Sequence, residues 1–124
     1  MNSHNKKILL VEDDESNRLC LRDFLEHEGY ICEEAANGAQ GLKSLQLGNF
    51  DLIITDLNMP VMNGWQLLEA LEKDPRLKHV PVLIVTGEDL PKTETLSTFP
   101  AVKTILRKPF DFPKIARTLT ALFS

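Results

Sequence analysis

Short apolar runs alternate with amphipathic segments along the whole chain. Three runs are nearly continuous in Val, Ile and Leu, as in strands buried on both faces: Lys7–Val11, Leu52–Thr55 and Val82–Val85. A fourth run, Val102–Leu106, is less uniformly apolar, and Tyr30–Ala35 carries two glutamates, which is typical of an edge strand. The pattern therefore predicts five strands, with the second strand at an edge of the sheet.

The segments between these runs have the periodicity of amphipathic helices. The first expected helix is Ser16–Glu28, with Asp14 or Ser16 as its cap and Gly29 after its end. The others are a helix between Asn37 and Gly48, Gly64–Lys73, a short helix at about Lys92–Thr98, and a last helix capped by Asp111. Strands that alternate with helices in this way predict one parallel sheet with right-handed crossovers.

Helices on both faces of such a sheet give a three-layer α/β/α fold. We expect the flavodoxin-like, doubly wound (βα)5 arrangement with strand order 2-1-3-4-5. Ligands of such sheets bind where the strand order reverses, at the carboxyl ends of strands 1 and 3. Glu12, Asp13 and Asp56 stand at these two ends.

Composition and charge exclude several classes of protein. The 124 residues suffice for one domain, 43% are hydrophobic, and the formal net charge is −4 without a basic cluster longer than a pair. Nucleic acid is therefore not an expected partner. No apolar run approaches the ~20 residues that span a bilayer, and no signal-peptide segment precedes Lys7. We expect a cytoplasmic protein without membrane association.

Cysteines and histidines form no recognisable metal or catalytic motif. Cys20 and Cys32 lack metal-site spacing, and we expect both to be buried, reduced thiols. His4, His27 and His79 are scattered, so neither a zinc site nor a Ser/His/Asp triad can be assembled from neighbouring residues.

The acids at the switch point suggest phosphoryl chemistry. Three crowded carboxylates repel one another, so they either hold protons or recruit a cation, and an all-oxygen set suits Mg²⁺. A carboxylate such as Asp56 can act as a nucleophile toward phosphorus. Thr86 and Lys108, at the ends of two further strands, would offer a hydroxyl and a positive charge to a bound phosphoryl group.

Four short motifs stand at the predicted strand ends. They are Val11-Glu12-Asp13-Asp14, Asp56-Leu57-Asn58-Met59-Pro60-Val61-Met62-Asn63-Gly64, Val85-Thr86-Gly87 and Lys108-Pro109-Phe110. With these motifs the chain resembles the response-regulator receiver domain of two-component signalling, over essentially its whole length. The resemblance implies one receiver domain over residues 1–124, with a core at about residues 6–123 and no output domain.

The resemblance also implies roles for three residues in phosphoryl transfer. Asp56 matches the phosphoacceptor, Thr86 the switch hydroxyl, and Lys108 the lysine that binds the phosphoryl group, with a cis bond to Pro109. The phosphoryl group would come from a phosphohistidine on a sensor histidine kinase or a histidine phosphotransfer protein. The signal would pass to an unidentified downstream protein, and the chain would be a phosphoacceptor rather than an enzyme.

A metal site is implied in the same way. Glu12 and Asp13 match the acidic pair that binds Mg²⁺ (or Mn²⁺) with Asp56, Asp13 directly and Glu12 through water. The backbone carbonyl of Asn58 matches the position that completes this site. Asp14 lies outside the acidic pair and is expected to cap a helix.

Two segments depart from the receiver pattern, and they keep alternatives open. Ile105 stands where receivers commonly carry an aromatic residue, and Phe99-Pro100-Ala101 replaces the usual small turn before strand 5. Ile105 leaves room for a pseudo-receiver or adaptor that works without phosphorylation.

A flavin or nucleotide binder would require a Gly-, Ser- or Thr-rich loop in place of the acids after strand 1. A dehalogenase-like phosphatase would require Asp in place of Asn58. Trp65 is expected to be a half-buried packing residue.

Overall fold

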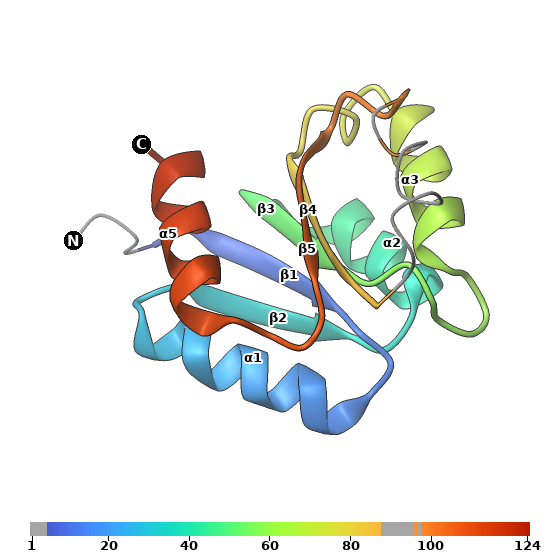
Figure 1. Cartoon of the computed structure of the whole chain (residues 1–124). Coiled ribbons are helices and arrows are strands. Elements are labelled where there is room, and N and C mark those ends of the chain that lie inside the picture. Colours follow the sequence, from blue (N-terminus) through green and yellow to red (C-terminus); the bar gives the residue numbers. More distant parts are fainter. Residues whose placement is uncertain (1–4, 88–95, 97) are drawn as a thin grey trace.

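The computed structural model describes residues 5–87, 96 and 98–124, and it contains one sheet of five parallel strands (Figure 1). The strands are β1 (Lys7–Val11), β2 (Ile31–Ala35), β3 (Leu52–Thr55), β4 (Val82–Thr86) and β5 (Val102–Arg107), and the described helices are α1 (Glu15–His27), α2 (Gly38–Leu47), α3 (Gly64–Glu72) and α5 (Phe112–Leu122). The strand order is β2-β1-β3-β4-β5, which confirms the predicted fold. The predicted helix Lys92–Thr98 lies outside the described residues, apart from Leu96 and Thr98.

The sheet is covered on both faces, and alternate residues of each inner strand enter different cores. One cluster, with α2 and α3, contains Leu9, Val11, Ile53, Ile84, Leu45, Leu67 and Leu71. The other, with α1 and α5, contains Ile8, Leu10, Ile54, Leu83, Leu21, Leu25, Ile115 and Leu119. This double burial explains why the inner strands read as continuous apolar runs. No helix in the described part of the chain has the length and apolarity needed to cross a membrane.

Side-chain caps start the helices close to the carboxyl ends of the strands. Asp14 accepts a hydrogen bond from the Asn17 amide at 2.8 Å, which confirms Asp14 rather than Ser16 as the first cap. The predicted caps Asn37 and Asp111 are confirmed as well. Asn63 forms a capping box with Gln66 at the start of α3.

The prediction for the two cysteines is half wrong. Cys32 is buried, and burial raises the pKa of its thiol to about 12. Cys20, however, is exposed. The face of α1 that packs on the sheet is centred on Leu21 and Leu25, and Cys20 is rotated by about 100° from Leu21 around the helix.

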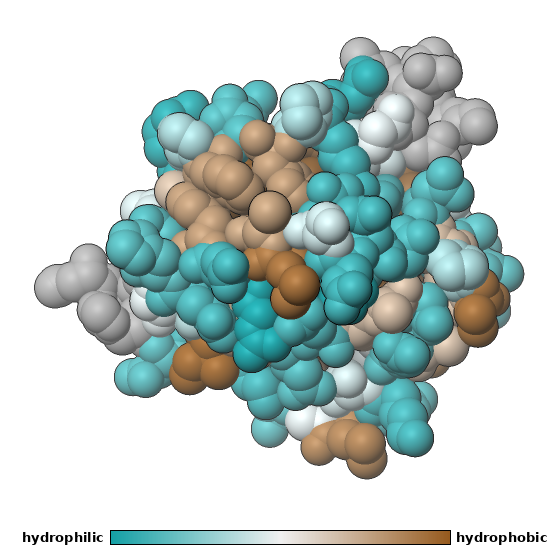
Figure 2. All heavy atoms as spheres, turned by 90° about the horizontal axis from the view of Figure 1, so that it is seen from below, coloured by the Kyte–Doolittle hydropathy of each residue, from teal (hydrophilic) through white to brown (hydrophobic). Residues whose placement is uncertain are grey.

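An apolar patch interrupts the otherwise mostly hydrophilic surface on the side of α1 (Figure 2). On the α1 and α5 side of the sheet, Phe24 stacks on Phe112 with ring centroids 4.7 Å apart, and Phe110 lies 5.9 Å from Phe112. All three rings are partly buried. They connect α1 to the start of α5 and to the segment before it, which follows Lys108.

A charged network joins α1 to the edge strand β2. Glu34 accepts a hydrogen bond from Arg18 Nε at 2.8 Å and is also paired with Arg22. Arg18 donates a second hydrogen bond, from Nη1 to the backbone carbonyl of Glu12 at 2.8 Å. These arginine contacts hold the pKa of the Glu34 carboxyl below its ordinary value. The network therefore connects the edge of the sheet to the acidic loop after β1.

Glu34→Gln is expected to reduce the free energy of unfolding by about 1 kcal/mol at neutral pH, because an amide cannot form the charged pairs with Arg18 and Arg22. Since the folded-state pKa of Glu34 lies below its ordinary value of 4.5, this stabilisation is complete above that pH. It is lost as the pH falls through the lower folded-state pKa. Urea unfolding of both chains at neutral and acidic pH measures the difference.

Glu33→Gln is the matched control, since Glu33 pairs with Lys7 at 3.7 Å through side chains that are 43% and 36% exposed. We expect a change below about 0.5 kcal/mol at neutral pH. Equal losses in the two variants, or a Glu34→Gln deficit that persists at acidic pH, would contradict this account.

Candidate functional site

The carboxyl ends of the strands bring the predicted site residues to one edge of the sheet. The parallel register pairs Val11 of β1 with Thr55 of β3, so Glu12 and Asp56 leave adjacent strands side by side. The amide of Asp56 donates to the Val11 carbonyl at 3.2 Å, and the amide of Lys108 donates to the Thr86 carbonyl at 2.9 Å. The strand order reverses at β1 and β3, where such sheets bind ligands.

Lys108 bridges two buried carboxylates. Its Nζ lies 2.7 Å from Glu12 Oε1 and 2.7 Å from Asp56 Oδ2. The side chains of both acids are 7% exposed, whereas that of Lys108 is 22% exposed. Two carboxylates this deeply buried require a nearby positive charge, and the ammonium group supplies it from the end of another strand.

Backbone amides orient the remaining carboxylate oxygens. Asp56 Oδ1 accepts hydrogen bonds from the amides of Leu57 at 2.6 Å and Asn58 at 3.3 Å. Glu12 Oε2 accepts one from the amide of Asp14 at 3.1 Å. Both oxygens of Asp56 are therefore held, one by the backbone and one by Lys108.

The electrostatics of the cluster follow from burial and pairing. Burial raises the pKa of Glu12 above its ordinary value, and the hydrogen bond from Lys108 opposes that shift. Burial also acts to lower the pKa of Lys108, but its hydrogen bonds to Asp56 and Glu12 outweigh this and raise it. Lys108 consequently keeps its positive charge at neutral pH.

Glu12, Asp13 and Asp56 offer a set of oxygen ligands for a cation. One carboxylate oxygen from each lies within 4.8 Å of the other two. Asp13 is exposed, whereas Glu12 and Asp56 are buried, so the set opens toward solvent on the side of Asp13. A hard cation that retains water ligands, such as Mg²⁺, fits three carboxylates arranged in this way.

The other predicted site residues lie at the same edge. Thr86 is fully buried at the end of β4, and the Lys108–Pro109 bond is cis, as predicted. Asn58 is exposed in the loop after β3 and its amide contacts Asp56. The use of its carbonyl as a metal ligand stays a prediction. Ile105 pairs with Ile84 in the register of β4 and β5 and packs, partly buried, on the core beneath α3.

Two further residues shape the site, and sequence reasoning did not identify them. A Cβ on Gly64 would lie 2.3 Å from the carbonyl oxygen of Asp56 and 2.7 Å from the Cα of Leu57, so only glycine lets α3 begin this close to the phosphoacceptor candidate. Arg18 holds the Glu12 carbonyl. The capping residue Asn63 directly before a glycine was a usable signal for Gly64, but nothing in the sequence pairs Arg18 with Glu34.

The match to a known family extends over almost the whole chain. Residues 8–120 match the family model of the response regulator receiver domain. The chemotaxis protein CheY-3 of Vibrio cholerae is 34% identical over 120 residues, covering 96% of this chain and 92% of CheY-3. The chain therefore belongs to the response-regulator receiver domains of two-component signalling.

Solved structures of this family share the fold. The signal receiver domain of a histidine kinase from Syntrophus aciditrophicus is similar with a TM-score of 0.85 and 32% identity, over 94% of this chain and 89% of that chain. TrrA, a response regulator from Thermotoga maritima, was crystallised in complex with Mg²⁺-BeF. It is similar with a TM-score of 0.82 and 28% identity, over 94% of this chain and 98% of that chain.

Gly64→Ala is expected to reduce the free energy of unfolding by about 1–3 kcal/mol, because the new methyl group would overlap backbone atoms that cannot rotate away. Gly87→Ala is the matched control beside Thr86, since no atom of the described residues, apart from its chain neighbours, lies within 4 Å of an added Cβ. For the control we expect a change within about 0.5 kcal/mol. Denaturant unfolding measures both, and equal stability of the two variants would refute the close approach at Gly64.

Proposed function

We propose that Asp56 accepts a phosphoryl group from a phosphohistidine in a Mg²⁺-dependent reaction in the cytoplasm. The donor is a sensor histidine kinase or a histidine phosphotransfer protein. The observation that carries the proposal is the contact of Lys108 with both buried acids, beside a third carboxylate from Asp13. A structural ion pair needs one acid for one base. The surplus of oxygen ligands at this edge instead suits a cation together with a phosphoryl group.

The transfer needs a nucleophile that is already oriented. A carboxylate oxygen of Asp56 attacks phosphorus and forms a P–O bond, while the P–N bond of the phosphohistidine breaks and its electron pair stays on the imidazole nitrogen, which takes up a proton. The amides of Leu57 and Asn58 hold the carboxylate in position during this step. The product is an acyl phosphate on Asp56.

Lys108 and a cation bound by the three acids would together compensate the negative charge of the phosphoryl group. The Lys108 ammonium, which contacts Asp56 Oδ2, is placed to pair with an oxygen of the incoming phosphoryl group. Glu12, Asp13 and Asp56 would hold Mg²⁺, with the Asn58 carbonyl as a further ligand, and the bound cation would neutralise charge on the acids and the phosphoryl oxygens. The Mg²⁺-BeF complex of TrrA, a protein of the same family, supports this ligand class.

The phosphorylated domain then signals by changed contacts with another protein rather than by catalysis on a separate substrate. Thr86, at the end of β4 beside Lys108, is the proposed switch residue. On the neighbouring strand β5 the register partner of Thr86 is Arg107, and Ile105, two residues before it, has no aromatic ring. The response is therefore expected to stay close to the loops that follow β3 and β4.

Incubation with Mg²⁺ and a small phosphodonor such as acetyl phosphate is expected to add one phosphoryl group (about 80 Da) to the chain. The reason is that backbone amides orient Asp56 and that neighbouring carboxylates can bind the cation. Intact-mass spectrometry measures the gain. A chelator should abolish it, and Asp13→Asn should raise the Mg²⁺ concentration that is required.

Asp56→Asn should show no gain, since an amide is not a competent nucleophile. Asp14→Asn is the matched control, because Asp14 lies in the same acidic loop and asparagine also caps helices. This control should be phosphorylated like the native chain. No added mass in the native chain, or an equal gain in Asp56→Asn, would show the proposal to be wrong.

Phosphorylation is expected to change amide hydrogen exchange after β3 and β4 more than in β5, because Ile105 has no ring to reorient. Ile105→Tyr is the matched variant, and its ring should extend the changes into β5. Exchange measured by mass spectrometry with and without the phosphodonor makes the comparison. Changes centred on Ile105–Phe110 in the native chain, with none around Thr86, would contradict this switch.

A further inference from the structure

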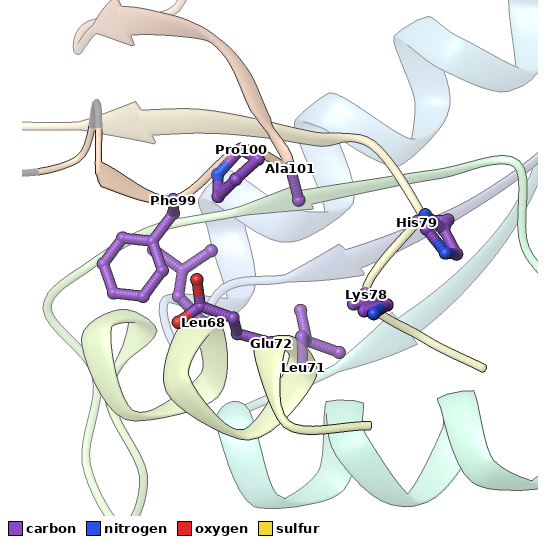
Figure 3. A pocket seen from close by; sticks show the side chains of 8 residues that line it. All are labelled: Leu68, Leu71, Glu72, Lys78, His79, Phe99, Pro100 and Ala101. Carbon is purple, nitrogen blue, oxygen red and sulfur yellow. The ribbon is translucent and has the colours of Figure 1, made fainter. Parts of the chain in front are cut away.

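A cavity of about 370 Å³ lies at the amino ends of β4 and β5 (Figure 3). Its walls come from the carboxyl half of α3, from the loop before β4 and from the segment before β5. Amino ends of parallel strands lie at the edge away from their carboxyl ends, so this cavity is separate from the acidic cluster. Its volume falls in the lower part of the range of ligand pockets, ~300–1,000 Å³.

The interior of the cavity is apolar, and hydrogen bonds and core packing hold its walls in place. Leu68 and Leu71 of α3 form part of the wall and are each 2% exposed. Phe99 and Ala101 stand across from them and pack on the same core. The carbonyl of Phe99 accepts from the Val102 amide at 3.0 Å, and that of Ala101 accepts from the Val82 amide at 2.8 Å. The segment that departs from the receiver pattern is thus a fixed wall of this cavity.

Polar, ionisable side chains lie at separate places on the rim. Lys78 and His79 stand together on the loop before β4, whereas Glu72 lies on α3 with its carboxylate turned toward Leu68 (Figure 3). Within residues 5–87, 96 and 98–124, none of these three side chains is part of an ion pair. The ammonium group of Lys78, the imidazole of His79 and the carboxylate of Glu72 are accordingly available to a ligand.

We propose that this cavity binds a small monocarboxylate with an apolar body. The carboxylate lies at Lys78 and His79, and the apolar body covers Leu68, Leu71 and Phe99. Glu72 disfavours a second negative charge at the other end of the ligand. The site does not depend on phosphoryl transfer to Asp56, so either proposal can fail while the other holds.

Octanoate is a suitable probe, because it has one carboxylate and an unbranched apolar chain. Titration into the isotope-labelled full chain, followed by amide NMR spectra, is expected to give saturable shifts at residues 68–72, 78–82 and 99–102. Octanol lacks the charge and should bind at least about threefold more weakly. Suberate has the same length with a second carboxylate and should bind about tenfold more weakly.

Variants of the exposed rim residues test the charge assignment without disturbing the core. The double variant Lys78→Gln/His79→Gln should weaken octanoate binding about fivefold and leave octanol binding unchanged. Glu72→Gln should strengthen suberate binding relative to octanoate. Lys114→Gln, which removes an exposed charge from α5, is the matched control and should change none of these affinities.

The absence of saturable shifts in these three segments would overturn the proposal. Shifts confined to the aromatic residues between α1 and α5 would overturn it too, because they would indicate unspecific binding to the apolar surface there. Equal binding of octanoate and octanol, or unchanged octanoate binding in the double variant, would overturn the carboxylate assignment. A native-like amide NMR spectrum of the double variant outside these three segments would confirm that the variant is folded.

Discussion

The structure depends on one ammonium group between two buried carboxylates. Lys108 lies 2.7 Å from both Glu12 and Asp56, and these contacts join the ends of β1, β3 and β5. Loss of the lysine would leave two negative charges side by side in a site with little access to water, which is strongly unfavourable. The contact exists only because the strand order places β1 and β3 at the switch point, with β5 following β4 on the same side.

Backbone geometry around this contact is fixed by residues that do no chemistry. Gly64 lets α3 start against the Asp56 carbonyl, and Asn63 caps that helix one residue earlier. Arg18 holds the Glu12 carbonyl from α1 and is itself held by Glu34 on the edge strand. The acids are therefore positioned from both faces of the sheet, as a preorganised site requires.

The two edges of the sheet carry different kinds of site. The carboxyl edge gathers charge and is suited to phosphoryl transfer, whereas the amino edge of β4 and β5 has an apolar cavity with charges only at its rim. Helix α3 takes part in both, because it begins at Gly64 beside Asp56 and lines the cavity with Leu68 and Leu71. One helix thus contacts both sites.

The sequence by itself determined the strands, most helix starts and the identity of the acids, because continuous apolar runs and capping residues act locally and the alternation of elements leaves few topologies. The periodicity of the sequence did not fix how α1 is rotated about its own axis, and the prediction that Cys20 is buried was therefore wrong. Only the tertiary structure decided the contacts of Lys108 and Arg18. Their partners lie 96, 52 and 16 residues away, and such pairs are selected by strand register and helix packing rather than by neighbouring sequence.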